Sequence, residues 1–212
     1  MEATRTQKSI KNAAVSVVAQ VFSLVVNFAT RTALVWGLGS YYLGLNSVMT
    51  SLIAVFALAE LGLGNAIVFS LYLPLAKRNK SKVEAYLRLF KTLYRCVGCA
   101  IILLGCLALP FLGTLINGDV TAEVVIAYLL FVANTALSYF LLNYRTTLIQ
   151  ANQERYLVTL AELIYAAIGA VLQIFFFCVI HSFILGVASL LVAQIGKSIF
   201  IYVVCRKRYS KI

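Results

Sequence analysis

The chain has 212 residues, of which 62% are hydrophobic and only 12% are charged, and its formal net charge is +11. A water-soluble domain carries about 25% charged residues, so this composition, with a mean hydropathy of +0.95, excludes an ordinary soluble domain. A basic chain can also bind nucleic acid, and the location of its basic residues decides whether that interpretation survives.

Apolar stretches long enough to cross a bilayer fill most of the chain, since a helical span takes about 20 residues. We therefore predict an all-α membrane protein in which residues 1–212 form one six-helix transmembrane lobe. The predicted helices are, in chain order, 11–36, 43–73, 88–112, 122–148, 156–180 and 183–205. Short polar connections separate them, and no low-complexity linker interrupts the series.

The basic residues alternate between successive connections. Lys and Arg occur at the N-terminus, after the second helix, after the fourth helix and at the C-terminus, whereas the connections near Gly39, Asp119 and His181 contain none. This is the positive-inside pattern, and it predicts that both termini are cytoplasmic. Topology thus explains the net charge, and we expect no nucleic-acid partner.

The first predicted helix carries a polar stripe along its length. Its members recur at spacings of 4, 4, 3, 4 and 4 residues: Asn12, Ser16, Gln20, Ser23, Asn27 and Arg31. At about 100° per residue they occupy an arc of roughly 100°. Interhelical hydrogen bonding needs only one or two such residues, so a full-length stripe favours a hydrated cleft over simple helix packing.

The second predicted helix places a carboxylate in the apolar stretch FALAELGLGNAIVFSLY. Glu60 is 17 residues from both Leu43 and Lys77, which is about 25 Å of helix in each direction and puts it near the bilayer midplane. An ionised carboxylate there costs roughly 2.5–3.5 kcal/mol on insertion scales, so it is expected to bind a substrate or ion, or to pair with a basic residue. Gly62 and Gly64 are the predicted hinge of this long segment.

The later helices also carry polar residues on one face each. Together with Gln20, the residues expected to line the cleft are Asn46, Asn134, Glu162 and Gln173. The basic residues Arg31, Arg145 and Lys197 would give the cleft positive charge, which suits an anionic group such as a diphosphate. Two plainer interpretations stay open: Arg31 extends to the outer headgroups, or Glu60 pairs with Arg31 or Lys197 and only holds the bundle together.

The third predicted helix contains a Cys-x-x-Cys pair, Cys96 and Cys99. Zinc would need two further ligands, and the single histidine, His181, is predicted on the opposite side of the membrane. We expect no metal or cofactor, and we interpret Gly98 and Gly105 as positions where a neighbouring helix packs closely. No Walker A loop, HExxH motif or nucleophile elbow occurs, so we expect no enzymatic activity.

The stretch FALAELGLGNAIVFSLYLPLAKRNKSKVEAYLRLFKTLYR resembles the second and third helices of bacterial polysaccharide-transport flippases, in the multidrug/oligosaccharidyl-lipid/polysaccharide exporter superfamily. The stretches SIKNAAVSVVAQVFSLVVNFATRTALVWGLGSYYLGLNSVMTS and LLFVANTALSYFLLNYRTTLIQANQERY are similar to the same family. So is the order of six helices. The resemblance covers nearly the whole chain.

Members of this family have two six-helix lobes, twelve to fourteen helices in all, around a cleft that opens to either side in turn. The resemblance implies that this chain is the first lobe, in the bacterial cytoplasmic membrane, as a truncated product, half of a split carrier or a subunit that pairs with a second-lobe chain. The implied substrate is a lipid-linked oligosaccharide of the polyprenyl-diphosphate type, which cells use to build surface polysaccharides. Membrane lipids would surround the chain. The substrate-binding residues would be Asn27, Arg31, Glu60, Arg145 and Lys197.

Two other functions remain open. The chain is a lobe of a cation-coupled exporter from the related multidrug branch, or it is a truncated membrane subunit that transports nothing itself. A cleft for cationic drugs would hold more acid than base, whereas the residues above make it basic or balanced.

Overall fold

The computed structural model describes residues 5–57, 63–77, 79–116, 120–141 and 143–209. Over these ranges the chain is almost entirely helical and contains no β-strand, which confirms the all-α prediction. In chain order the helices are α1 (Arg5–Leu38), α2 (Ser40–Ala57), α3 (Leu63–Ala76), α4 (Lys80–Ala108), α5 (Leu112–Ile116), α6 (Ala122–Leu141), α7 (Asn143–Ala151), α8 (Arg155–Cys178) and α9 (Phe183–Tyr209). A 3₁₀ turn, Leu109–Phe111, joins α4 to α5.

Among the described residues, the segments long and apolar enough to cross a membrane are Ile10–Leu38, Lys80–Ile116, Ala122–Leu141, Arg155–Cys178 and Phe183–Lys207. Five of the six predicted spans thus correspond to described helices that could cross a membrane, and the predicted count of six is not confirmed. The predicted span 43–73 is divided instead between α2, with 18 residues, and α3, with 14. A straight helix from Ser40 to Ala76 would be about 55 Å long, against a hydrocarbon layer of about 30 Å.

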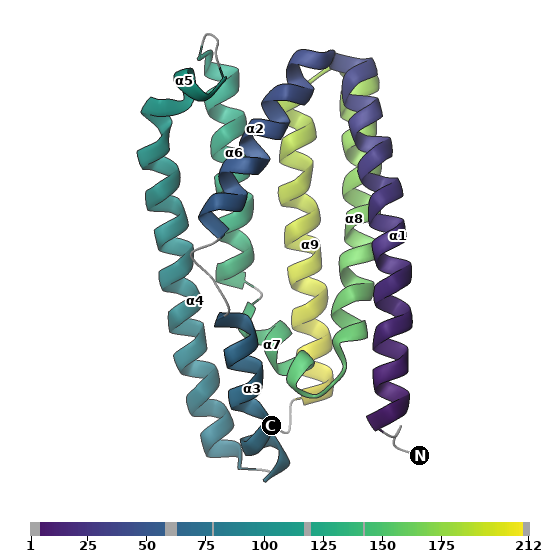
Figure 1. The fold of residues 1–212 in the computed structure, drawn as a ribbon, viewed down its shortest axis with the longest axis vertical. Helices are drawn as coiled ribbons and strands as arrows, with labels where there is room; N and C mark the ends of the chain where they lie inside the picture. Colours follow the sequence, from purple (N-terminus) through teal and green to yellow (C-terminus); the bar gives the residue numbers. More distant parts are fainter. Residues whose placement is uncertain (1–4, 58–62, 78, 117–119, 142, 210–212) are drawn as a thin grey trace.

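The two short helices take different courses. Figure 1 shows α2 running obliquely from the upper end of the bundle, whereas α3 lies beside α4 near the lower end. Residues 58–62 lie outside the described part of the chain, and with them Glu60 and Gly62. Gly64 belongs to the first turn of α3.

Three other boundaries differ from the prediction for local reasons. The helix predicted to begin at 88 begins at Lys80, because Asn79 caps it by accepting a hydrogen bond from the backbone N–H of Lys82 at 3.1 Å. At its other end Pro110 lies in the 3₁₀ turn before α5. The predicted helix 122–148 is two helices, α6 and α7, on either side of position 142.

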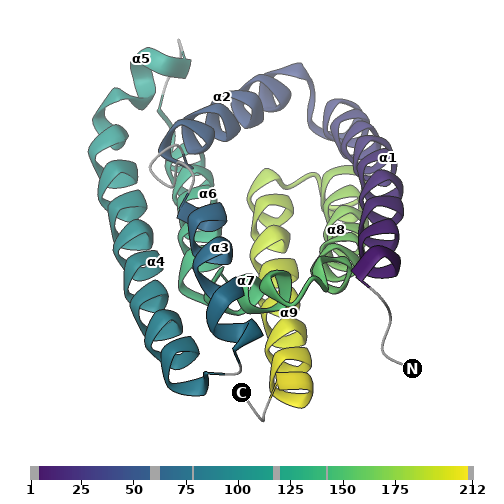
Figure 2. The same cartoon turned by 60° about the horizontal axis from the view of Figure 1, so that its bottom comes forward.

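The long helices pack in the order α1, α8, α9, α6 and α4, with each one against the next (Figure 2). Close approach of α4 and α6 depends on glycine. A β-carbon at Gly105 would lie 2.7 Å from a methyl group of Val132, and one at Gly98 would lie 3.0 Å from the ring of Phe140. This confirms the packing role predicted for the two glycines, and Tyr128 of α6 donates a buried hydrogen bond to the backbone oxygen of Gly105 at 3.0 Å.

Helix α1 packs mainly along α8. At the upper end, the ring Nδ1 of His181 donates a hydrogen bond to the backbone oxygen of Gly37 at 2.8 Å. At the lower end, the side-chain amide of Asn12 donates to the backbone oxygen of Gln153 at 3.0 Å. The two helices are therefore joined near both of their ends.

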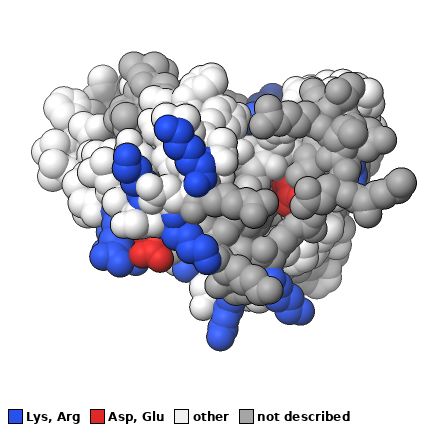
Figure 3. All heavy atoms as spheres, turned by 90° about the horizontal axis from the view of Figure 1, so that it is seen from below, with Lys and Arg blue, Asp and Glu red and all other residues white. Residues whose placement is uncertain are grey.

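The start of α1 and the end of α9 lie at the same end of the bundle, together with the α3–α4 and α7–α8 connections (Figure 1). We call this the basic end. Viewed from this end, Lys and Arg side chains stand out over the surface, with few acidic ones (Figure 3). The α1–α2, α5–α6 and α8–α9 connections lie at the opposite end. The alternation of basic connections along the sequence thus corresponds to two ends of one molecule.

Candidate functional site

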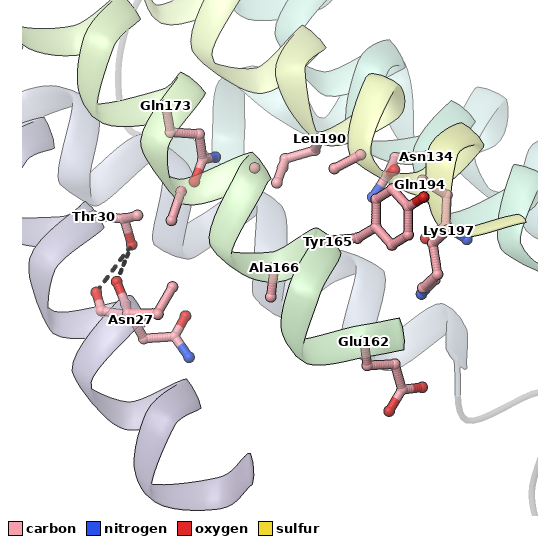
Figure 4. A pocket seen from close by; sticks show the side chains of 14 residues that line it. Asn27, Thr30, Asn134, Glu162, Tyr165, Ala166, Gln173, Leu190, Gln194 and Lys197 are labelled. Atoms are coloured by element: carbon pink, nitrogen blue, oxygen red, sulfur yellow. Dashed lines mark hydrogen bonds between the residues drawn. The ribbon is translucent and has the colours of Figure 1, made fainter. Parts of the chain in front are cut away.

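A cavity of about 350 Å³ opens between α1, α6, α8 and α9 (Figure 4). We call it the polar cavity. Its polar lining residues are Asn27, Thr30, Asn134, Glu162, Tyr165, Gln173, Gln194 and Lys197. The volume falls in the range of roughly 300–1,000 Å³ that is usual for small-molecule sites. Polar side chains inside a bundle of membrane length are costly to bury in lipid, so a cavity that they line is a candidate functional site.

Helix α8 forms much of the cavity wall. Its lining positions recur at spacings of 4, 3 and 4 residues and so lie on one helix face: Glu162, Ala166, Gly169 and Gln173. The two small residues leave space between the polar ones, and a β-carbon at Gly169 would lie only 3.3 Å from that of Ala193 on α9. The cavity therefore follows from small side chains at the level where α8 and α9 approach closely.

Two buried polar atoms of the cavity lack a partner. Within the described ranges, the side-chain oxygen of Asn134 and the side-chain nitrogen of Gln194 make no hydrogen bond. Gln194 is only 9% exposed. An unsatisfied buried group costs about 1–3 kcal/mol, and such groups are normally satisfied in native proteins. An occupant of the cavity, water or a ligand, is the remaining source of these hydrogen bonds.

The polar cavity also contains one charge of each sign. Glu162 extends from α8 and Lys197 from α9, and in Figure 4 both side chains point to the same side of the cavity. The two do not form a direct ion pair in the described part of the structure. Because neither neutralises the other by contact, both are available to a ligand that carries charge.

A second cavity, of about 270 Å³, lies between α1 and α8 closer to the basic end. Its polar lining residues are Ser16, Gln20, Ser23, Arg155, Thr159 and Glu162. It shares Glu162 and Ala166 with the polar cavity, so the two are neighbours along α8. Most of the predicted polar stripe of α1 thus borders a cavity, whereas Asn12 hydrogen-bonds to the α7–α8 connection.

The structure brings together several of the residues predicted for the site and leaves others apart. In the polar cavity are Asn27, Asn134, Glu162, Gln173 and Lys197, and in the second cavity are Gln20 and Glu162. Arg31 is exposed on α1 and Asn46 belongs to α2, and neither lines these two cavities. The guanidinium of Arg145 on α7 lies 4.5 Å from the ring centre of Tyr202 instead.

The binding roles of all these residues stay predictions, and so does the hinge at Gly62 and Gly64. Glu60 and Gly62 lie outside the described part of the chain. Residues that the sequence-based prediction omitted from the site are Thr30, Arg155, Thr159, Tyr165 and Gln194. A signal existed for Gln194, which precedes Lys197 by three residues and so shares its helix face. Thr159 likewise precedes Glu162 by three residues.

Comparison of the chain with protein-family models, with curated proteins and with solved structures finds no match in any of the three. The resemblance to polysaccharide-transport flippases therefore depends on the quoted stretches of sequence alone.

Proposed function

We propose that the chain is a transporter lobe that, together with a second lobe, moves a lipid-linked oligosaccharide of the polyprenyl-diphosphate type across the bacterial cytoplasmic membrane. The observation that carries this proposal is the polar cavity among helices of membrane length, with the unpartnered side-chain nitrogen of Gln194 on its wall. The resemblance to polysaccharide-transport flippases supplies the substrate class.

The donors of the cavity suit a diphosphate. Lys197 and Gln194 lie on one face of α9, where Lys197 provides an ammonium group and Gln194 an amide N–H. Phosphate oxygens accept charge-assisted hydrogen bonds from such donors. Glu162 on α8 repels a diphosphate, so a proton or cation bound there would favour substrate binding and would couple transport to an ion gradient.

Binding to the purified chain in lipid nanodiscs tests the proposal. A polyprenyl diphosphate should bind at least tenfold more tightly than the matching polyprenol, because only the diphosphate uses Lys197. Loss of a charge-assisted hydrogen bond costs about 1.5–3 kcal/mol, so Lys197→Met should weaken diphosphate binding by roughly 10- to 150-fold. Lys207→Met, on the exposed end of the same helix, is the control. Equal affinity of the intact chain for the two lipids would refute the proposal.

Glu162 favours a second candidate function, a cation-coupled exporter of small molecules, because this carboxylate lines both cavities. Cells that express the chain would then resist cationic drugs and dyes, and Glu162→Gln would abolish the resistance. Drug efflux without any change in lipid-linked oligosaccharide export would favour this candidate over the flippase.

A further inference from the structure

The two cavities follow one another along α1 and α8, because Glu162 and Ala166 line both of them. The α8 positions that line them recur at spacings of 4, 3, 4, 3 and 4 residues: Arg155, Thr159, Glu162, Ala166, Gly169 and Gln173. Opposite them, α1 contributes Ser16, Gln20, Ser23, Asn27 and Thr30. We call this feature the α1–α8 furrow.

The furrow is almost as long as the membrane is thick. Arg155 is the first residue of α8, at the basic end, and Gln173 is five residues before its last. The 18 residue steps from one to the other correspond to about 27 Å of helix, and the hydrocarbon layer is about 30 Å thick. Polar groups therefore follow one another across nearly the whole apolar layer.

Exposed apolar side chains lie beside the polar stripe of α1, about 100° around the helix from it. There Val17 is 65% and Phe28 is 74% exposed. The polar stripe of α1 between Ser16 and Asn27 is exposed as well. The same helix thus offers one face to lipid tails and an adjacent face to polar groups. A lipid could keep its acyl chains in the bilayer while its headgroup occupies the furrow.

The charges of the furrow alternate. Arg155 is positive, Glu162 is negative, and Lys197 is positive on the adjoining wall of the polar cavity. A headgroup with a phosphate and an ammonium group matches this order, because its phosphate pairs with Arg155 or Lys197 and its ammonium with Glu162. The unpartnered side-chain N–H of Gln194 can also donate a hydrogen bond to a phosphate oxygen.

We propose that the α1–α8 furrow carries the headgroups of zwitterionic phospholipids between the two leaflets, without an energy source. This activity goes beyond the proposed function and does not depend on it, since it uses the lipids of the surrounding membrane and no diphosphate. It needs a polar path along the helices that a headgroup can enter, and the two neighbouring cavities and the exposed stripe of α1 are the observations that support one.

The experiment places the purified chain in liposomes that contain phosphatidylethanolamine with a fluorophore on one acyl chain. Dithionite, which does not cross the membrane, bleaches the outer leaflet only, so bleaching of the inner-leaflet lipid measures its movement. The intact chain should produce this second bleaching phase, and protein-free liposomes should not. A correctly folded chain that leaves the inner leaflet protected would overturn the proposal.

Two matched tryptophan variants test the path. Ala166→Trp fills the place where the two cavities meet and should slow lipid movement at least tenfold. Ile168→Trp, on the same helix at a position that is 44% exposed and lines neither cavity, should leave the rate unchanged. Equal rates for the two variants would overturn the assignment to the furrow. Should circular dichroism show that Ala166→Trp does not fold, Ser23→Phe blocks the furrow from α1, with the same expectation.

Headgroup chemistry gives a third readout. Glu162→Gln should slow phosphatidylethanolamine more than phosphatidylglycerol, which has no ammonium group, and equal slowing would contradict the charge assignment. The inference and the proposed function fail separately. Lost lipid movement with intact diphosphate binding refutes only the inference, whereas lipid movement without selective diphosphate binding refutes only the proposed function.

Discussion

Asn12 of α1 and Gln153, which lie 141 positions apart in the sequence, are joined by a hydrogen bond of 3.0 Å from the Asn12 side-chain amide to the Gln153 backbone oxygen. The side-chain oxygen of Asn12 also accepts from the backbone N–H of Tyr156 at 2.9 Å. The first N–H groups of a helix have no partner within it. Asn12 therefore caps α8 from another helix and holds a connection in which Gln153 has a φ of 60°.

Asn12→Ala should lower the free energy of unfolding by about 1–3 kcal/mol, because it leaves a carbonyl oxygen and a helix N–H without their partners. Thermal unfolding in detergent, followed by circular dichroism, measures the change. Ser16→Ala, one turn further along α1 and exposed, is the control and should have almost no effect. An Asn12→Ala protein as stable as this control would show that the cap contributes nothing.

Gly37 and Gly44 should respond in opposite ways to alanine. A β-carbon at Gly37 would collide with the backbone oxygen of Phe177, whereas nothing lies within 4 Å of one at Gly44. Gly37→Ala should therefore destabilise the protein by about 1–3 kcal/mol or more, as overpacking does. Gly44→Ala, inside α2, should stabilise it by up to about 1 kcal/mol. The same unfolding measurement ranks the two variants, and the reverse order would contradict the packing of α1 on α8.

Gln194→Leu tests whether the polar cavity is hydrated. In a hydrated cavity the amide already has water as a partner, so the free energy of unfolding should change by less than about 1 kcal/mol. In a dry cavity the substitution would remove an unsatisfied polar group and would stabilise the protein by about 1–3 kcal/mol. We expect the small change, together with weaker binding of polyprenyl diphosphate. A clear rise in stability would argue against a hydrated cavity.

The two ends of the bundle should lie on opposite sides of the membrane. Position 119 lies between α5 and α6, whose adjoining ends are at the end opposite to the basic one (Figure 1). Alkaline phosphatase fused at Asp119 should be active, because it is exported, and a fluorescent protein fused after Ile212 should fluoresce in the cytoplasm. Activity of the two reporters with the opposite assignment would reverse the predicted orientation.

Helix periodicity was enough to group the polar residues of a single helix. The spacing of Glu162, Ala166 and Gln173 predicts one face of α8, and the structure has all three on one cavity wall. The same arithmetic identified the stripe of α1, because a regular helix turns by a constant angle per residue. The periodicity of Gly98 and Gly105 likewise indicated a close helix contact, which α6 provides.

Periodicity failed where a helix is not continuous. The prediction that Arg145 faces the cleft assumes one helix over 122–148, but α6 ends at Leu141 and α7 begins at Asn143. The change of axis between them takes Arg145 to Tyr202 instead of the cavity. The division of 43–73 has the same origin. Hydropathy predicts which residues leave water, and it does not predict where a long apolar segment changes direction.

The attachment of α1 to α8 near both ends limits how the furrow between them can change shape. Asn12 holds the lower end through Gln153, and Gly37 holds the upper end through His181. Helix α1 is thus attached at both of its ends, and it cannot move away from α8 as a rigid body without breaking one of these hydrogen bonds. The furrow could widen only if the middle turns of α1 bent away from α8. The width of the furrow therefore limits the size of a headgroup that passes along it.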